Sequence, residues 1–262
     1  MKHLYLLLSV ALLGLFCNQA SGQMLPVKGG EYVPLYGKVT ETRVQVKSFL
    51  MDVQPVTMAE YAAFLEANPK WKKSQVKRLF ADQNYLKDWV SDLDFGIMNP
   101  NRPVNNVSWY AAKAYCECQG KRLPTVDEWE YAAMASPTMV DARRDSLYNV
   151  GILSSYETPK TFMKEVGKST PNIHGIKDLH GLVWEWTSDF NSIMMSGNNR
   201  SGENDRQLFC AAGSYGATDL MNYAAFMRYA LRSSVKANYS LTNMGFRCVK
   251  DINAESKNNQ SL

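Results

Sequence analysis

The sequence predicts one domain of mixed helices and strands in which regular helix is confined to a few segments. Strong helical periodicity occurs in only a few places along the 262 residues, and two capped helices follow one another in the middle of the chain. No Pro/Gly/Ser-rich spacer, internal repeat or low-complexity run divides the sequence. These observations favour one large, loop-rich domain.

The first of the two helices is expected within residues 106–116, which read NVSWYAAKAYC. Ser108 is suited to be the N-cap, because its side chain can accept a hydrogen bond from a free backbone N–H of the first turn. Trp109, Ala112 and Cys116 would share one face, and Gly120 would end the helix.

The second helix is expected within residues 120–130, which read GKRLPTVDEWE. Pro124 precedes the start, and Thr125 and Glu128 have the three-residue spacing of a capping box, in which each side chain bonds the backbone of the other. The chain therefore predicts a helix, a sharp stop and a second helix in direct succession.

These two helices resemble the core signature of the formylglycine-generating enzyme family, also called the sulfatase-modifying factor family. Three further blocks resemble the family in the same order: residues 49–57 (FLMDVQPVT) with Tyr61 and Phe64, residues 171–186 with PNIHG and DLHGLVWEW, and residues 243–248 (NMGFRC). The resemblance spans about Val27 to Asp251. It implies an irregular α+β fold related to C-type lectins, with short antiparallel strands and long loops tied by a disulfide and calcium.

The N-terminus has the three parts of a secretory signal. Lys2 precedes an apolar run from Leu4 to Phe16, and small residues at 20–22 end the segment. The run is shorter than the ~20 residues that span a membrane, so we expect residues 1–22 to be removed and the protein to be periplasmic or secreted. An outer-surface lipoprotein anchored at Cys17 is less favoured, because Phe16 stands where a small residue is needed. Residues 23–251 would form the domain, and residues 252–262 a polar tail.

Charge gives little support for a nucleic-acid partner. The net charge is +4, or +3 without Lys2, and basic residues are scattered among acidic ones. The densest basic stretch, residues 70–78 (KWKKSQVKR), is compatible with an acidic partner or membrane phosphate. The favoured interpretation is a solvated helix face with Trp71, Val76 and Leu79 turned inward.

Four cysteines lie beyond the expected signal, and an even number in an exported chain favours disulfides. The resemblance implies the pair Cys116 and Cys248. Cys118 and Cys210 would either bond each other or stay free. A soft-metal site of these thiols with methionines such as Met194, Met195, Met221 and Met227 is the alternative, but the spacing is not that of known ligand pairs.

The catalytic members of the family use a pair of cysteines that bind copper and oxidise a client cysteine. The corresponding stretch here, residues 211–224 (AAGSYGATDLMNYA), contains no cysteine. Ser214 matches a family serine, and Ala217 stands at the position of the first cysteine. Copper or iron therefore has no evident ligand pair, and formylglycine formation is not predicted. If the chain is an enzyme, a question that the sequence leaves open, Cys210 and Ser214 are the catalytic candidates.

The resemblance also implies a structural calcium site. Its ligands would be Asp178, the backbone at Gly181 and Val183, and Glu185, since calcium takes oxygen ligands in flexible geometry. The alternative is that the two acidic residues only cap turns around Trp184 and Trp186. His174 and His180 are interpreted as loop or packing residues, because no third ligand accompanies them.

Three arginines, Arg228, Arg232 and Arg247, resemble those that support the last strands and the substrate groove of the family; salt bridges within the scaffold explain them equally well. Three functions remain open. The first is an exported homologue without the copper-binding cysteines that binds or assists maturation of a periplasmic client protein. The second is a metal-dependent oxidoreductase with a rebuilt site, and the third is a lectin-like binding module.

Overall fold

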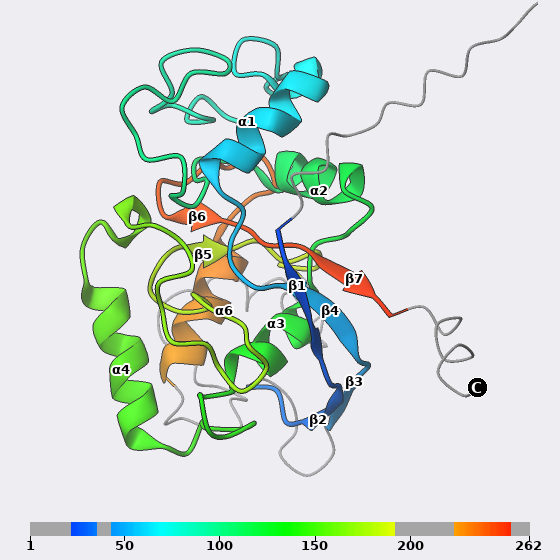
Figure 1. Ribbon diagram of the computed structural model, residues 1–262, viewed down its shortest axis with the longest axis vertical. Coiled ribbons are helices and arrows are strands. Elements are labelled where there is room, and N and C mark those ends of the chain that lie inside the picture. Colours follow the sequence, from blue (N-terminus) through cyan, green and yellow to red (C-terminus); the bar gives the residue numbers. More distant parts are fainter. Residues whose placement is uncertain (1–21, 36–42, 192–222, 253–262) are drawn as a thin grey trace, which may run out of the picture.

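The computed structural model describes residues 22–35, 43–191 and 223–252, which form an irregular α+β fold of short helices and small sheets (Figure 1). In chain order the elements are β1 (Met24–Val27), β2 (Gly30–Tyr32), β3 (Val44–Val46), β4 (Phe49–Asp52), α1 (Met58–Ala67), η1 (Pro69–Trp71), α2 (Trp109–Cys118), α3 (Val126–Ala133), α4 (Ser146–Glu157), η2 (Thr161–Met163), β5 (Trp184–Glu185), α6 (Tyr223–Ser234), β6 (Met244–Gly245) and β7 (Val249–Asp251). The mixed, loop-rich class predicted from the sequence is confirmed.

The largest sheet joins the two ends of the described chain. Strand β4 is central and pairs antiparallel with β1 on one side and β7 on the other, so Met51 lies opposite both Leu25 and Val249. A parallel pair of β5 and β6 sets Trp184 opposite Met244. Segments that are far apart in sequence therefore meet at two places in the fold.

The capped helices form as the sequence predicts. The Ser108 hydroxyl accepts a hydrogen bond from the N–H of Ala111 at 3.2 Å at the start of α2. At the start of α3, the Glu128 N–H donates to Thr125 Oγ1 at 3.1 Å, and the Thr125 N–H donates to Glu128 Oε2 at 2.8 Å. Gly120, in the left-handed region at φ 65°, follows the end of α2. Local sequence therefore fixes where both helices begin.

An aromatic cluster lies beneath α1 and α2. Tyr61 and Phe64 of α1 pack on Tyr115 of α2, with ring centroids 5.9 and 5.4 Å apart, and Tyr61 and Tyr115 both contact Phe246 edge to face. All four residues are buried. The family blocks that begin and end the domain thus share one core.

The structure contains a disulfide between Cys116 and Cys248, with Cα atoms 5.6 Å apart, which is the pairing that the resemblance implies. It joins the end of α2 to the residue before β7. Cys118 is also disulfide-bonded. Its candidate partner from the sequence, Cys210, lies outside the described residues.

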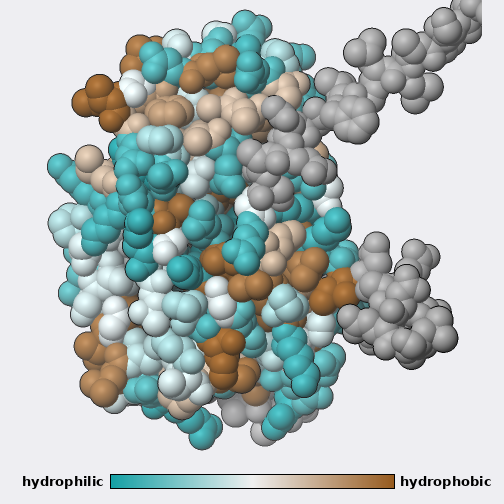
Figure 2. All heavy atoms as spheres, viewed as in Figure 1, coloured by the Kyte–Doolittle hydropathy of each residue, from teal (hydrophilic) through white to brown (hydrophobic). Residues whose placement is uncertain are grey.

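The basic stretch does not form the helix that was predicted. The short helix η1, with Pro69 at its first position, ends at Trp71, and the chain continues in separate turns without successive helical hydrogen bonds. Trp71 and Val76 are half-buried, but Leu79 is 72% exposed, so its predicted inward orientation is wrong. Figure 2 shows hydrophilic side chains over much of one face of the molecule, with hydrophobic ones in separate groups. No helix in the described ranges is both long and apolar enough to span a membrane.

We expect removal of the disulfide to lower stability substantially. Its cysteines are 132 residues apart, and cross-linking so long a loop restricts the unfolded chain by ~4 kcal/mol in the entropic description. For a domain of this size the Cys116→Ala, Cys248→Ala double variant should melt roughly 10 °C lower than the oxidised protein. Differential scanning calorimetry measures this difference, with the oxidised wild type as reference. An unchanged melting temperature would show that the bond does not constrain the unfolded state.

Candidate functional site

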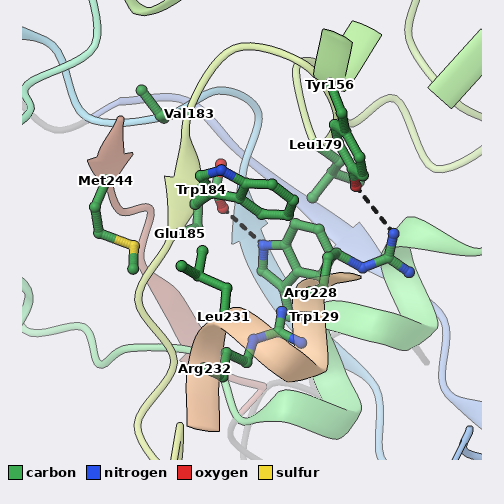
Figure 3. A pocket seen from close by; sticks show the side chains of 10 residues that line it. All are labelled: Trp129, Tyr156, Leu179, Val183, Trp184, Glu185, Arg228, Leu231, Arg232 and Met244. Atoms are coloured by element: carbon green, nitrogen blue, oxygen red, sulfur yellow. Dashed lines mark hydrogen bonds between the residues drawn. The ribbon is translucent and has the colours of Figure 1, made fainter. Parts of the chain in front are cut away.

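The signature segment around β5 carries two tryptophans, Trp184 in the strand and Trp186 directly after its end. Trp186 is buried in the aromatic core, and its Nε1–H donates to the carbonyl of Val107 at 2.9 Å. Trp184 points the other way and lies against Tyr156 of α4, with ring centroids 4.6 Å apart. Figure 3 shows Trp184 beside Trp129 of α3, with α6 beneath them. Helices α3, α4 and α6 therefore meet the strand at one place.

Glu185, between these two tryptophans, forms a fully buried ion pair with Arg247. The guanidinium donates twice, from Nε to Glu185 Oε2 and from NH2 to Oε1, at 2.8 Å each, and both side chains are 0% exposed. Trp129 Nε1–H donates to the same carboxylate at 2.7 Å. Arg247 also donates to the backbone carbonyls of Asp52 and Val53 at 3.2 and 3.3 Å. A doubly hydrogen-bonded pair with further donors and acceptors satisfies the charges that burial removes from water.

A second buried centre joins α3 to α6. Glu130 accepts from Arg228 at 2.6 to 3.1 Å and from Arg232 at 2.6 Å. The two guanidiniums also lie over the Trp129 ring, 5.4 and 5.0 Å from its centroid. Burial alone would raise the pKa of Glu130, but the charges of Arg228 and Arg232 outweigh it and lower the pKa from its ordinary 4.5 to about 2.

Hydrogen bonds to two neutral side chains, Tyr156 and His180, extend the network from Arg228. Arg228 NH1 donates to the Tyr156 hydroxyl at 3.0 Å, and Tyr156 lies 3.2 Å from Nδ1 of His180. The other ring nitrogen, Nε2, is 2.9 Å from the carbonyl of Ala133 and must donate to it, so Nδ1 accepts from Tyr156. Burial, reinforced by the Arg228 charge, lowers the pKa of His180 from 6.5 to about 3. His180 is therefore a neutral packing residue, as predicted.

Two cavities adjoin Trp184. The inner one, drawn in Figure 3, lies between Trp129, Tyr156, Trp184 and the two α6 arginines, and its volume of about 10 Å³ suffices for one water molecule. The outer one has a volume of about 190 Å³ and lies between the end of α4, the turn through η2, residues 181–184 and Asn243. The outer cavity is large enough to receive a chemical group from outside.

Comparison with known proteins identifies the scaffold. Residues 11–252 match the sulfatase-modifying factor enzyme 1-like domain. The chain belongs to the formylglycine-generating enzyme family. The formylglycine-generating enzyme of Streptomyces coelicolor is 30% identical over 277 aligned residues, covering 87% of this chain and 86% of that protein. The solved structure of PvdO from Pseudomonas aeruginosa has the same fold, with a TM-score of 0.55 and 18% identity, covering 90% of this chain and 97% of that one.

Another relative carries a different description. The bovine protein called inactive C-alpha-formylglycine-generating enzyme 2 is 30% identical over 168 residues, covering 56% of this chain and 49% of that protein. Membership of the formylglycine-generating enzyme family thus fixes the fold, and the residues at each position decide the chemistry.

The residues that the family resemblance assigned to calcium lie in two separate hydrogen-bond networks. Asp178, at φ 55°, accepts from the N–H groups of Gly167 and Ser169, and its own N–H donates to Ser169 Oγ at 2.8 Å. Glu185 is bound by Arg247 and Trp129, and a guanidinium occupies the space beside it. The two carboxylates as placed therefore do not fit direct ligation of a cation, and no functional step depends on calcium. Calcium bound by Asp178, Gly181, Val183 and Glu185 stays a prediction that metal analysis tests.

The structure separates the other candidates into two groups. Arg228, Arg232 and Arg247 are buried in ion pairs, which supports their interpretation as scaffold. Cys210 and Ser214 lie outside the described residues. Within the described ranges, no group of three or more histidine, cysteine, aspartate or glutamate side chains is arranged to hold a metal ion.

Sequence reasoning missed two residues of the buried network. Glu130 lies on the second signature helix and Tyr156 lies on α4, and neither stood out from nearby polar residues. The signal for Glu130 is its position five residues beyond the cap Thr125, on the same helix face as the apolar Val126 four residues earlier, which is buried. An acidic residue on a buried helix face requires a cationic partner elsewhere in the chain.

The buried neutral His180 should make stability fall with acid. Its folded pKa of about 3 lies below the ordinary 6.5, so the unfolded chain binds the proton first as pH decreases. Between pH 6.5 and 4.5 this linkage should cost about 2 kcal/mol of unfolding free energy. His180→Gln keeps a donor for the carbonyl of Ala133 and removes the titration.

Urea unfolding of both proteins across this pH range measures the effect. The difference between variant and wild type should shrink steadily below pH 6.5, with the difference at pH 7.5 as the baseline cost of the substitution. A difference that is independent of pH would contradict the buried neutral state of His180.

Proposed function

We propose that this protein is an exported member of the formylglycine-generating enzyme family that lacks the copper-binding cysteine pair and binds a client protein in the periplasm, or assists its maturation. The observation that carries the proposal is the absence of cysteine from residues 211–224, where the catalytic members have their pair. Thiolates are soft ligands that copper requires, and alanine, serine or methionine side chains at those positions supply no redox thiol.

The state of the other cysteines supports this proposal. Cys116, Cys118 and Cys248 are all disulfide-bonded, so none of the three presents a thiolate. With the signal peptide removed, Cys210 is the remaining cysteine of the chain. A bond between Cys118 and Cys210 would leave the mature protein without a free thiol.

The pairing of the three buried arginines also bears on where a ligand can bind. The arginines that resemble those of the family groove are committed to Glu130 and Glu185, at distances of 2.6 to 3.1 Å. A guanidinium held by a buried carboxylate is not free to bind a substrate anion, because its release would leave that carboxylate buried without a partner. The open outer cavity beside Trp184 remains available for a ligand.

Metal analysis and thiol counting on mature protein purified from an oxidising compartment together test the proposed function against the oxidoreductase alternative. We expect two disulfides, Cys116–Cys248 and Cys118–Cys210, no thiol that reacts after denaturation, and no stoichiometric copper or iron. Mass spectrometry of non-reduced peptides assigns the bonds, and elemental analysis reports calcium in the same sample. Copper or iron bound together with a free Cys210 would instead support the oxidoreductase with a rebuilt site, with Cys210→Ala and Ser214→Ala separating the two candidate ligands.

A direct activity test follows from the resemblance. Supplied with copper and the cysteine-containing substrate peptide of the Streptomyces coelicolor enzyme, this protein should form no aldehyde detectable by mass spectrometry. The Streptomyces coelicolor enzyme is the positive control under identical conditions. Copper-dependent aldehyde formation above the level of copper alone would overturn the proposed function.

A further inference from the structure

The outer cavity is built from three segments that the fold holds firmly together. Thr161 Oγ1 donates to the carbonyl of Leu182 at 3.0 Å, which fixes the turn through η2 to the loop before β5. Gly181 lies so close to α4 that a Cβ there would be 2.5 Å from the Cβ of Ser155. The N–H of Trp184 donates to the carbonyl of Asn243 at 2.8 Å. The cavity is therefore a preformed feature of the scaffold.

One side of the cavity is apolar and aromatic. The half-buried rings of Trp184 and Phe162 line it together with the buried side chains of Leu182 and Val183. Trp184 packs against Tyr156, which also lines the cavity and whose hydroxyl is bound by Arg228 and His180. The rings thus present a fixed surface to a ligand, with little conformational freedom to lose on binding.

The charge at the mouth of the cavity comes from Lys160. It is the one charged residue among those that line the cavity in the described part of the chain, and it takes part in none of the salt bridges between described residues. Its backbone lies in the left-handed region, at φ 55° and ψ 31°, where glycine is much easier to accommodate than lysine. Left-handed conformations at non-glycine residues are found disproportionately at ligand-binding sites. The position therefore keeps a lysine at some cost to stability.

We propose that this cavity binds a carboxylate-bearing group of about the size of one amino acid, with the carboxylate at Lys160 and an apolar side chain against Trp184 and Phe162. The volume of about 190 Å³ exceeds the ~150 Å³ that accommodates benzene in an engineered protein cavity, and it is below the ~300 Å³ typical of sites for larger ligands. The cation and the aromatic surface select an anion with an apolar body. This inference rests on the proposed binding function only for the source of the ligand, which is the C-terminus of a client peptide.

The test uses the mature protein and three probes: N-acetyl-Gly-Gly-Phe as the free acid, the same peptide as its C-terminal amide, and N-acetylphenylalanine. Dissociation constants are measured by ligand-observed NMR titration at low ionic strength, because salt screens an exposed charge. We expect the free acid to bind about fivefold to tenfold more tightly than the amide, since only the acid forms a charge-assisted hydrogen bond. Tighter binding of the peptide than of N-acetylphenylalanine identifies a client C-terminus as the source; equal binding identifies a small free carboxylate, and either result supports the site.

Two substitutions at Lys160 separate binding from folding. Lys160→Met keeps the aliphatic stem, and Lys160→Gly relieves the left-handed backbone, so the second variant should be at least as stable as the wild type. Both should reduce affinity for the free acid to that for the amide. Lys164→Met is the matched control, because Lys164 is exposed four residues away and does not line the cavity.

Equal affinity for acid and amide, an unchanged dissociation constant in Lys160→Met, or no binding of the free acid at millimolar concentration would each overturn the carboxylate site. These failures are distinguishable from failure of the proposed function. Aldehyde formation in the copper assay would overturn the proposed function but would not affect the evidence for carboxylate binding. Loss of carboxylate binding would overturn the site but would not change the result expected in the copper assay.

Discussion

The fully buried pair of Glu185 and Arg247 is the interaction on which the rest of the structure depends. It joins the two family blocks that form β5 and precede β7, and Arg247 also holds the carbonyls at the end of β4. Removing either partner would leave an uncompensated charge in the core, which is far more costly than the pair itself is stabilising. Trp129 completes the centre from α3, so strand pairing, helix position and charge satisfaction are coupled at one carboxylate. The disulfide at Cys248, one residue beyond Arg247, fixes the same segment between β6 and β7 covalently to α2.

The second centre has a different charge balance. Glu130 carries one negative charge and receives two guanidiniums, so this group alone has an excess of one positive charge. The faces of Trp129 stabilise that excess through their negative quadrupole, and the neutral side chains of Tyr156 and His180 continue the network without adding charge. The Arg228 charge adds to the effect of burial in lowering the pKa of His180, because Glu130 already pairs with two guanidiniums and the network holds no second carboxylate for a further cation. The scaffold thus favours the neutral form of His180 and the ionised form of Glu130 in the folded state.

The helix starts could be predicted from the sequence because capping is a local property. Ser108, Thr125 and Glu128 interact with backbone atoms within three residues, and the structure forms each of those bonds. The buried ion pairs could not be predicted in the same way, since Glu130 and Arg232 are 102 residues apart and nothing local marks them as partners. The basic stretch shows the opposite error. Its periodicity suggested a helix with Leu79 inside, but the chain forms a run of turns there and Leu79 is exposed. The family resemblance supplied the pairing of Cys116 with Cys248, which sequence spacing alone leaves undetermined.

The buried arginines and the exposed Lys160 differ in whether a carboxylate of the chain already pairs with them. Arg228, Arg232 and Arg247 are enclosed and paired with buried carboxylates of the same chain, so an external anion would have to displace a buried glutamate to reach them. Lys160 lies beside an open cavity whose lining contains no carboxylate among the described residues. An anion arriving there gains attraction without breaking an internal pair. The buried charges therefore specify the fold, and recognition of an anionic ligand falls to a residue outside the blocks that define the family.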